Sequence, residues 1–400
     1  MARQTAISIN TIPIGPLGII GMPGCEELTD KIDKYLVKWR KTQASEHAES
    51  IAFFGYQRDT YKIDVSIPRF GSGEGKGVIN ESVRGYDIYI VCDVFNYSCS
   101  YDMYGRKVYM SPDDHFADLK RVISALCSKP KRVSVIMPML YEGRQHKRSS
   151  RESLDCAMAL KELVHLGVEN IITFDAHDQR VQNAIPDKSF ENVMPTYQMI
   201  KALVNNVEDL NVDKDHLMII SPDEGALHRC IYFATQLGVN LGMFYKRRDY
   251  TKVVDGRNPI VAHEFLGDSV EGKDVVIIDD MIASGESMID VARQLKERKA
   301  RRVFAVATFG LFTKGLEVFD KCYEEGLIDK VITTNLTYQL PELFEKKWYE
   351  SADMSKYIAL IIDHLNHDAS LSDLLDPSER INARIAEYKT RHTISDNYEY

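Results

Sequence analysis

The chain has 400 residues, of which 44% are hydrophobic and 27% are charged, and its formal net charge is -9. A chain of this length can bury two cores of ordinary size, so two domains are expected. The net negative charge creates no overall attraction for nucleic acid or for an anionic membrane surface, and the sequence predicts neither as a partner. Any anionic substrate must therefore be held by local clusters of positive side chains.

The seven cysteines occur singly, in an odd number and without CxxC spacing. This usage indicates reduced thiols and a cytoplasmic protein. Near the start, Pro13, Pro16 and several glycines interrupt an apolar patch, and no small-residue cleavage site follows. The sequence therefore predicts no signal peptide, and no later apolar run approaches the roughly 20 residues of a membrane span.

Short apolar runs rich in Val and Ile alternate with helical patterns along the chain. In the first half the order is a strand in 86–95, a helix in 118–128, a strand in 132–140, a helix in 154–166 and a strand in 170–177. The second half repeats this order, with a strand in 216–225, a helix in 227–237, strands in 241–248 and 274–285, a helix in 286–298 and a strand in 302–310.

This alternation predicts an α/β fold in which mainly parallel sheets are flanked by crossover helices. Polar, glycine-bearing or acidic residues follow the apolar runs in both halves, where open α/β sheets bind their ligands. Three regions do not fit the alternation. We interpret residues 41–62 and 97–112 as insertions, and the charged segment after residue 348 as a helical extension with a loose end.

The most specific local pattern is VVIIDDMIASGES, residues 275–287. A buried strand is expected to end in Asp279 and Asp280, and a short turn then opens a helix. Backbone N–H groups of the turn and the hydroxyls of Ser284 and Ser287 can surround a phosphate at the positive end of that helix. The two carboxylates can accept hydrogen bonds from the hydroxyls of a ribose, although capping of the next helix is an alternative role for them.

This segment resembles the phosphoribosyl pyrophosphate motif of type I phosphoribosyltransferases, and the whole of residues 21–361 resembles the ribose-phosphate pyrophosphokinase family, also called phosphoribosyl pyrophosphate synthetases. The resemblance implies two tandem type I phosphoribosyltransferase-like domains. We expect an ATP-side domain in residues 19–196, a ribose 5-phosphate-side domain in 197–348 and a helical extension in 349–400. It also implies a homo-oligomer, a hexamer or its dimer unit, in which the segment around Phe70 reaches a neighbouring subunit's site.

The resemblance places ATP on two segments of the first half. The segment RFGSGEGKG matches the family's flag segment, which contacts adenine. Phe70 could alternatively be a core or hairpin aromatic. The segment RQHKRSSRE carries the positive side chains that phosphate binding needs, but it departs from the family because His146 and serines replace its aspartates. A solvated charge run is the alternative for this second segment. The residues implied for ATP binding are Phe70, Ser72, Glu74, Arg144, Gln145, Arg151 and His177.

The resemblance also implies magnesium, with His177 and Asp223 as its protein ligands. Magnesium keeps several waters and takes few protein ligands, so one imidazole, one carboxylate and the ATP phosphates suffice. Lys246 and Arg248 match the family pair that neutralises the transferring diphosphate, and they are the implied catalytic residues. Residues 249–268 would then form a mobile loop beside them.

Ribose 5-phosphate is the implied acceptor, and the implied reaction yields phosphoribosyl pyrophosphate and AMP for nucleotide biosynthesis. Glu286 and Ala283 depart from the family's usual turn, so a different ribose-bearing acceptor stays open, as does a catalytically silent regulatory homologue. A transferase acting on a base is disfavoured because it needs no ATP segments. The residues implied for the sugar phosphate are Asp279, Asp280, Ala283, Ser284, Gly285, Glu286 and Ser287.

Overall fold

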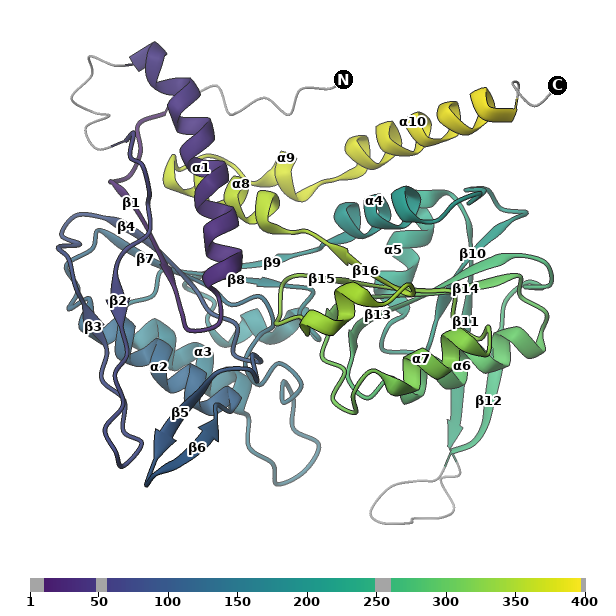
Figure 1. The fold of residues 1–400 in the computed structure, drawn as a ribbon, viewed down its shortest axis with the longest axis horizontal. Coiled ribbons are helices and arrows are strands. Elements are labelled where there is room, and N and C mark those ends of the chain that lie inside the picture. The colour runs from purple at the N-terminus through teal and green to yellow at the C-terminus, as the bar shows by residue number, and fades with distance from the viewer. Residues whose placement is uncertain (1–10, 48–55, 249–259, 397–400) are drawn as a thin grey trace. The chain divides into compact units, whose positions relative to one another are not determined.

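The structure, a computed structural model, describes residues 11–47, 56–248 and 260–396. The chain divides into two compact units, each built on one large sheet with helices on both faces (Figure 1). The first unit comprises Met1–Met194, Asn335–Tyr338 and Met354–Leu375, and the second comprises Pro195–Thr334, Gln339–Asp353 and Asp376–Tyr400. The predicted α/β class is confirmed. The expected domain limits stay a prediction, and the units differ from them because both include parts of residues 349–400.

The sheet of the first unit has the strand order β1-β4-β7-β8-β9, and all four pairings are parallel. Every residue of β4 and β8 is buried, as expected of strands covered on both faces. The strands are β1 (Leu17–Gly21), β4 (Asp87–Val91), β7 (Arg132–Ile136), β8 (Asn170–Phe174) and β9 (Ser189–Val193).

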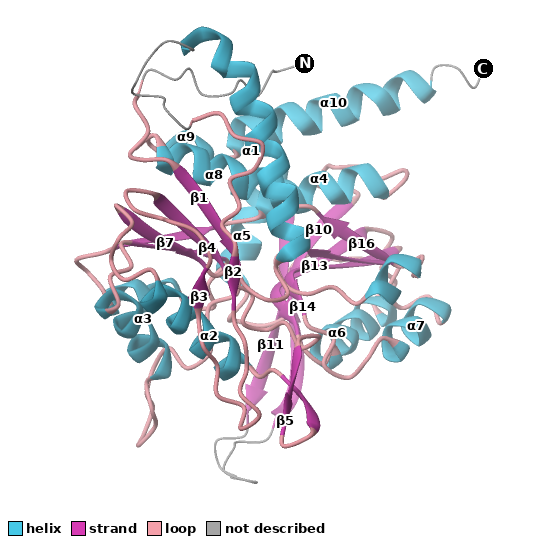
Figure 2. Cartoon of the chain, turned by 60° about the vertical axis from the view of Figure 1, so that its left-hand side comes forward, coloured by secondary structure: helices cyan, strands magenta, loops and turns pink. Residues whose placement is uncertain are grey.

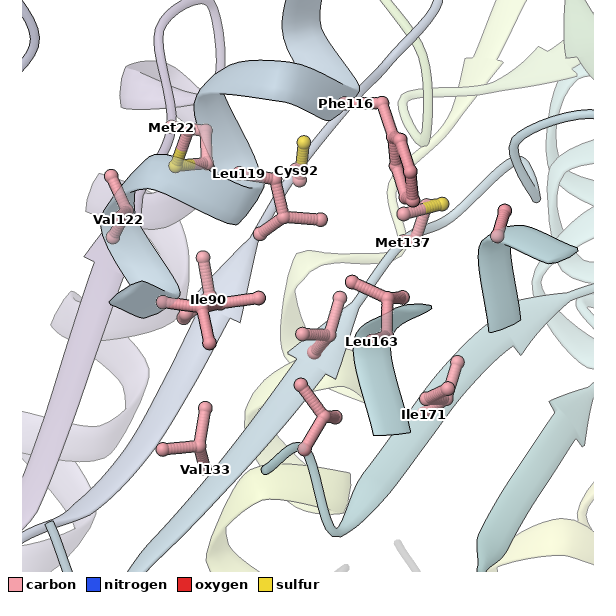
Figure 3. Packing of buried hydrophobic residues seen from close by; sticks show 14 of the residues in the cluster. Met22, Ile90, Cys92, Phe116, Leu119, Val122, Val133, Met137, Leu163 and Ile171 are labelled. Carbon is pink, nitrogen blue, oxygen red and sulfur yellow. The ribbon is translucent and has the colours of Figure 1, made fainter. Parts of the chain in front are cut away.

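Helices α2 and α3 cover one face of this sheet, and α1 and α8 lie on the other (Figure 1). Figure 3 shows part of the core beneath α2 and α3, where Ile90 of β4 lies near Leu119 and Val122 of α2. The helices of this unit are α1 (Glu26–His47), α2 (Pro112–Ala125), α3 (Asp155–His165), α8 (Ser355–Asn366) and α9 (Ser372–Leu375), with a 3-10 turn η2 (Gln179–Ala184).

Helix α2 begins six residues before the expected start at Asp118. Its start is fixed by a capping box, in which the Ser111 hydroxyl accepts from the Asp114 N–H and the Asp114 carboxylate accepts from the Ser111 N–H. Pro112 at the first helical position has the backbone φ that a helix needs. The expected boundary was wrong because Ser111 and Pro112, which start the helix, lie inside the segment that we interpreted as an insertion.

Before that cap, the segment 97–112 forms a hairpin of β5 (Ser100–Met103) and β6 (Arg106–Tyr109). Residues 41–47 of the other expected insertion extend α1, and residues 48–55 lie outside the described part. The chain then returns along β1, where the Ile19 N–H donates to the Tyr61 carbonyl at 2.8 Å. A short ladder of β2 (Val65–Ser66) and β3 (Val78–Ile79) follows.

The second unit has a seven-stranded sheet in the order β12-β11-β10-β13-β14-β15-β16, parallel except for the edge strand β12. Alternate residues of β13 contribute to two cores, so that Val276 and Ile278 lie in one and Val275 and Ile277 in the other. The strands are β10 (Leu217–Ser221), β11 (Asn240–Arg248), β12 (Ile260–Leu266), β13 (Asp274–Ile282), β14 (Arg302–Gly310), β15 (Lys330–Thr334) and β16 (Tyr349–Ala352).

The helices of the second unit fall on the two faces of this sheet, with α6 and α7 on one and α4, α5 and α10 on the other (Figures 1 and 2). The helical C-terminal region is confirmed, although β16 precedes it. The elements are α4 (Thr196–Asn206), α5 (Leu227–Leu237), α6 (Glu286–Glu297), α7 (Glu317–Glu324) and α10 (Ser378–Asp396), with a 3-10 turn η3 (Pro341–Glu345). None of the described helices is long and apolar enough to span a membrane.

Two expectations about local structure in this unit were wrong. The stretch 249–268 is not a loop throughout, because residues 260–266 form β12 and pair antiparallel with β11; residues 249–259 lie outside the described part. Strand β13 does not end at Asp279 and Asp280, as expected, but continues two residues further, since its pairing with β14 reaches Ile282 and Gly310. The long partner strand keeps the ladder intact past the two acids.

Candidate functional site

The predicted phosphate turn joins β13 to the 12-residue helix α6. Gly285 caps the helix with a φ of +83°, in the left-handed region that favours glycine. A Cβ atom at this position would lie 2.5 Å from Cζ of Phe319, so a side chain is excluded by packing as well. Ser284 is half-buried and Ser287 is exposed at the start of α6, where helix N–H groups favour an anion.

Asp279 and Asp280 lie within β13, shortly before the turn that Gly285 ends. Their side chains are 26% and 7% exposed, and the Asp280 N–H donates to Oδ1 of Asp279 at 2.8 Å. The guanidinium of Arg229 lies against both carboxylates, with Nη1 3.7 Å from Oδ1 of Asp279 and Nη2 3.9 Å from Oδ2 of Asp280. Arg229 was not predicted from the sequence.

Asp223 lies in the turn between β10 and α5. Its Oδ1 accepts hydrogen bonds from the N–H groups of Gly225 at 2.9 Å and Ala226 at 3.3 Å. This turn fixes the start of α5, the helix that carries Arg229. Burial and then the charges of Asp280 and Asp223 raise the pKa of Asp279, whereas Arg229 lowers it. Three predicted site carboxylates therefore interact electrostatically in the second unit.

Glu286, the departure from the family's usual turn, forms an ion pair with Lys314. Its Oε1 lies 2.5 Å from Nζ of Lys314, and both side chains are exposed, at 67% and 61%. This contact lowers the pKa of Glu286. Lys314 belongs to the loop after β14, which is tied to the phosphate turn by the Thr313 N–H donating to the Ala283 carbonyl at 2.9 Å. The acidic charge at the turn is thus partly compensated by a residue distant in sequence.

In the first unit, Phe70 lies on a tight turn and is 59% exposed, so it is not a core aromatic. Its N–H donates to the Glu74 carbonyl at 2.8 Å, and the Ser72 hydroxyl donates to Oε2 of Glu74 at 2.7 Å. The three residues expected to contact adenine therefore share one turn. An exposed aromatic ring beside polar side chains is suited to stacking on a planar base.

The β5–β6 hairpin packs against this turn. The Tyr104 N–H donates to the Gly71 carbonyl at 2.9 Å, and the Arg69 guanidinium lies 4.4 Å from the centroid of the Tyr101 ring. Arg69 also pairs with the buried Asp118 of α2 at 2.5 Å. The turn that carries Phe70 is consequently held from two sides, and the hairpin is part of its support.

The cationic segment after β7 and the residues after β8 lie together in the first unit. The rings of His146 and His177 are 5.5 Å apart, and Nε2 of His146 lies 3.3 Å from Oδ2 of Asp178. Gln145 is held by donation from Nε2 to the Ser153 carbonyl at 2.9 Å, while Arg144 and Arg151 are exposed. Two segments expected to bind ATP are therefore brought to one place.

Lys246 and Arg248 lie on the last residues of β11, where their backbone pairs with His263 and Ile260 of β12. Their side chains lie outside the described part of the chain. The structure therefore places them at the end of an edge hairpin of the second unit, and their roles stay a prediction.

Comparison with known proteins shows the family of the chain. Residues 17–167 match the N-terminal domain of ribose phosphate pyrophosphokinase, and residues 188–335 match the phosphoribosyl transferase domain. The chain belongs to the ribose-phosphate pyrophosphokinase family. The resemblance stated from the sequence is thereby confirmed.

Relatives with similar sequences include ribose-phosphate pyrophosphokinases of two bacteria. The ribose-phosphate pyrophosphokinase of Vibrio parahaemolyticus is 28% identical over 317 residues, which cover 78% of this chain and 91% of the relative. That of Aquifex aeolicus is 28% identical over 318 residues, covering 78% and 90%. A crystal structure of phosphoribosylpyrophosphate synthetase from Mycobacterium smegmatis has a TM-score of 0.68 and 20% identity, covering 88% of this chain and 99% of that one, and it supports the fold.

Sequence reasoning missed three contributions to the contacts described in these two units. Arg229 carries no local motif, because its role depends on α5 lying against β13. Lys314 is 28 residues from its partner Glu286. The sequence of the β5–β6 hairpin indicates only an insertion, and its support of the turn that carries Phe70 becomes visible only in the structure.

Proposed function

We propose that this protein transfers the β,γ-diphosphate of ATP to the 1-hydroxyl of ribose 5-phosphate, giving phosphoribosyl pyrophosphate and AMP for nucleotide biosynthesis. The observation that carries the proposal is the pair Asp279–Asp280 beside the Gly285 turn, in a chain of this family. Adjacent carboxylates suit the two ring hydroxyls of a ribose, and the start of α6 suits its phosphate. The 1-hydroxyl is then the group left to react.

In the proposed reaction the 1-hydroxyl oxygen attacks the β-phosphorus of ATP. The bond from that phosphorus to the oxygen shared with the α-phosphorus breaks, AMP leaves with the electron pair, and the hydroxyl proton passes to solvent. Positioning and charge neutralisation account for most of the rate in such transfers. We assign neutralisation to Lys246 and Arg248, which follow the apolar part of β11.

We assign adenine to Phe70, Ser72 and Glu74, because one exposed turn presents the ring and both polar side chains. The ATP phosphates are assigned to the cationic segment and to His177, whose ring lies near it. The residues of that segment proposed to contact ATP are Arg144, Gln145 and Arg151.

Magnesium is the proposed cofactor, with Asp223 and His177 as its protein ligands. The described residues contain no group of three or more His, Cys, Asp or Glu that could hold a metal alone. Magnesium needs no such group, since it binds through one or two carboxylates together with substrate phosphates and water. Asp223 lies near enough to Asp279 for its charge to raise the pKa of that carboxyl, after the larger effects of burial and Asp280, so several carboxylates gather in this part of the second unit. When bound, magnesium neutralises charge on the ATP phosphates.

The deciding experiment is AMP release by the purified full-length chain from ATP and magnesium, with ribose 5-phosphate, with other sugar phosphates and with no acceptor. We expect AMP only with ribose 5-phosphate, and loss of activity with EDTA that added magnesium restores. No AMP with any acceptor would refute the enzymatic proposal and favour a silent regulatory homologue.

A second acceptor is favoured by one observation, the Glu286–Lys314 pair at the phosphate turn. A carboxylate at this position alters the electrostatics of the phosphate site, so a different ribose-bearing acceptor is the alternative substrate. AMP release with such an acceptor at a higher kcat/KM than with ribose 5-phosphate would establish it.

We also propose that the protein is a cytoplasmic homo-oligomer, a hexamer or its dimer unit, as in the family to which it belongs. Its partners would be ATP and ribose 5-phosphate, without nucleic acid or membrane. Light scattering during gel filtration gives the mass of the assembly, and a monomer at micromolar concentration would contradict this proposal.

A further inference from the structure

Arg229 is the third residue of α5, and its positive side chain has little access to solvent, at 10% exposure. A buried guanidinium is costly unless opposite charges compensate it. Here the two terminal nitrogens face different carboxylates, Nη1 toward Asp279 at 3.7 Å and Nη2 toward Asp280 at 3.9 Å. The guanidinium therefore spans the pair.

The carboxylate pair needs such a cation. Two adjacent acids with exposures of 26% and 7% repel each other, and burial adds to the cost of ionising both. Burial and the charge of Asp280 raise the pKa of Asp279 to about 8, and Arg229 is the larger of the two influences that lower it, the other being the Asp280 N–H.

Arg229 is held in place by the helix that carries it. Asp223 fixes the first N–H groups of the turn that opens α5. The next residue, Cys230, is fully buried, and its Sγ lies 3.3 Å from the carbonyl oxygen of Ile278, directly before Asp279. The start of α5 is thus in direct contact with the backbone of β13 at the residue before Asp279.

We propose that Arg229 is a positioning residue that holds the Asp279–Asp280 pair in the orientation that binds the vicinal diol of the ribose. This inference rests on the proposed function and deepens it. The separations of 3.7 and 3.9 Å exceed hydrogen-bond length, so the cation compensates the charge of the pair without a direct hydrogen bond between these atoms. Arg229 acts on the sugar through the carboxylates and leaves ATP binding to other residues.

The test compares Arg229→Met with Arg229→Lys in steady-state kinetics on the full-length protein. We expect Arg229→Met to raise the KM for ribose 5-phosphate about tenfold to a hundredfold, with the KM for ATP unchanged, because hydrogen bonds to charged groups are weakened. A fall in kcat smaller than the rise in KM is expected for a group that acts on binding. Arg229→Lys retains the charge and should recover most of the loss.

Arg293→Met is the matched control, since Arg293 is an exposed arginine of α6 that pairs only loosely with Asp290, at 3.9 Å. It should change neither KM. If Arg229→Met does not fold, Arg229→Gln replaces it, and the KM for ribose 5-phosphate should rise from wild type through Arg229→Lys to Arg229→Gln.

Three outcomes would overturn the inference while leaving the proposed function intact. These are an unchanged KM for ribose 5-phosphate in Arg229→Met, an equal rise of both KM values, and a lysine variant no better than methionine. If the wild-type protein neither releases AMP nor binds ribose 5-phosphate in calorimetry, the proposed function and this inference fail together.

Discussion

Replacing Arg40 by methionine removes the cation from a buried ion pair that fastens α1 to α8. The side chains of Arg40 and Asp363 are 1% and 3% exposed, and Nη2 of Arg40 lies 3.0 Å from Oδ1 of Asp363. The same nitrogen donates to Oδ1 of Asn366 at 2.7 Å, and the guanidinium lies 4.4 Å from the ring centroid of Tyr56. The substitution leaves a carboxylate in the core without its main partner.

The magnitude follows from that uncompensated charge. Removing one partner of a buried pair costs about 3–5 kcal/mol, whereas replacing both by apolar residues is often neutral. We therefore expect Arg40→Met to destabilise the first unit by about 4 kcal/mol, and the double variant Arg40→Met/Asp363→Leu to recover most of this loss. A change of that size is a large share of a typical domain stability of about 5–15 kcal/mol.

The assay uses the two tryptophans of the chain, since Trp39 belongs to the first unit and Trp348 to the second. In a Trp348→Phe background, fluorescence during urea unfolding reports Trp39, which adjoins Arg40 on α1. The free energy of unfolding is then obtained by linear extrapolation. A loss below about 1 kcal/mol in the single variant, or a double variant that loses as much as the two single variants together, would refute the reasoning.

Three further predictions concern other sites. Gly285→Ala should destabilise the second unit by about 1–3 kcal/mol, because the φ of Gly285 is +83° and the new Cβ would lie 2.5 Å from the Phe319 ring. The same change should raise the KM for ribose 5-phosphate. Urea unfolding measures the first effect and steady-state kinetics the second. Burial raises the pKa of Asp93 to about 7, against about 3.9 when unfolded. The folded state therefore binds the extra proton between these values, and stability should fall as pH rises from about 4 to 7, a dependence that urea unfolding should find reduced in Asp93→Asn. Lys246→Ala should lower kcat with little effect on ATP binding, whereas Asp279→Ala should mainly raise the KM for ribose 5-phosphate; small, equal effects would contradict the assigned roles.

Much of the fold could be predicted from the sequence because its signals are local. The apolar runs that become β4, β7, β8 and β10 are short and bounded by polar residues, and their burial on both faces requires continuous hydrophobic stretches. Helix α5 was predicted with its observed bounds, since Gly238 ends it in the left-handed conformation.

The misplaced boundaries were set by contacts between segments or by caps that the apolar pattern does not contain. The end of β13 depends on β14 continuing beside it to Gly310, and an isolated reading of two aspartates ends the strand too early. The start of α2 depends on the pairing of Ser111 with Asp114, which lies before the first apolar repeat. The hydrophobic periodicity and composition of a segment predict that an element exists there, whereas strand partners and helix caps determine the residues at which it begins and ends.

The candidate site also has a part that could be predicted and a part that could not. The predicted phosphate turn is a contiguous motif, so the sequence was enough to identify it. The charged side chains that compensate its acids come from segments far apart in the sequence. Glu286 looks unfavourable beside a phosphate until Lys314, on the loop that donates from Thr313 to Ala283, is seen to pair with it. Asp279 and Asp280 likewise look like an uncompensated pair until Arg229 is placed against them. The two cations beside these acids come from the loop after β14 and from α5, so the electrostatics of the turn is a property of the folded unit rather than of the motif.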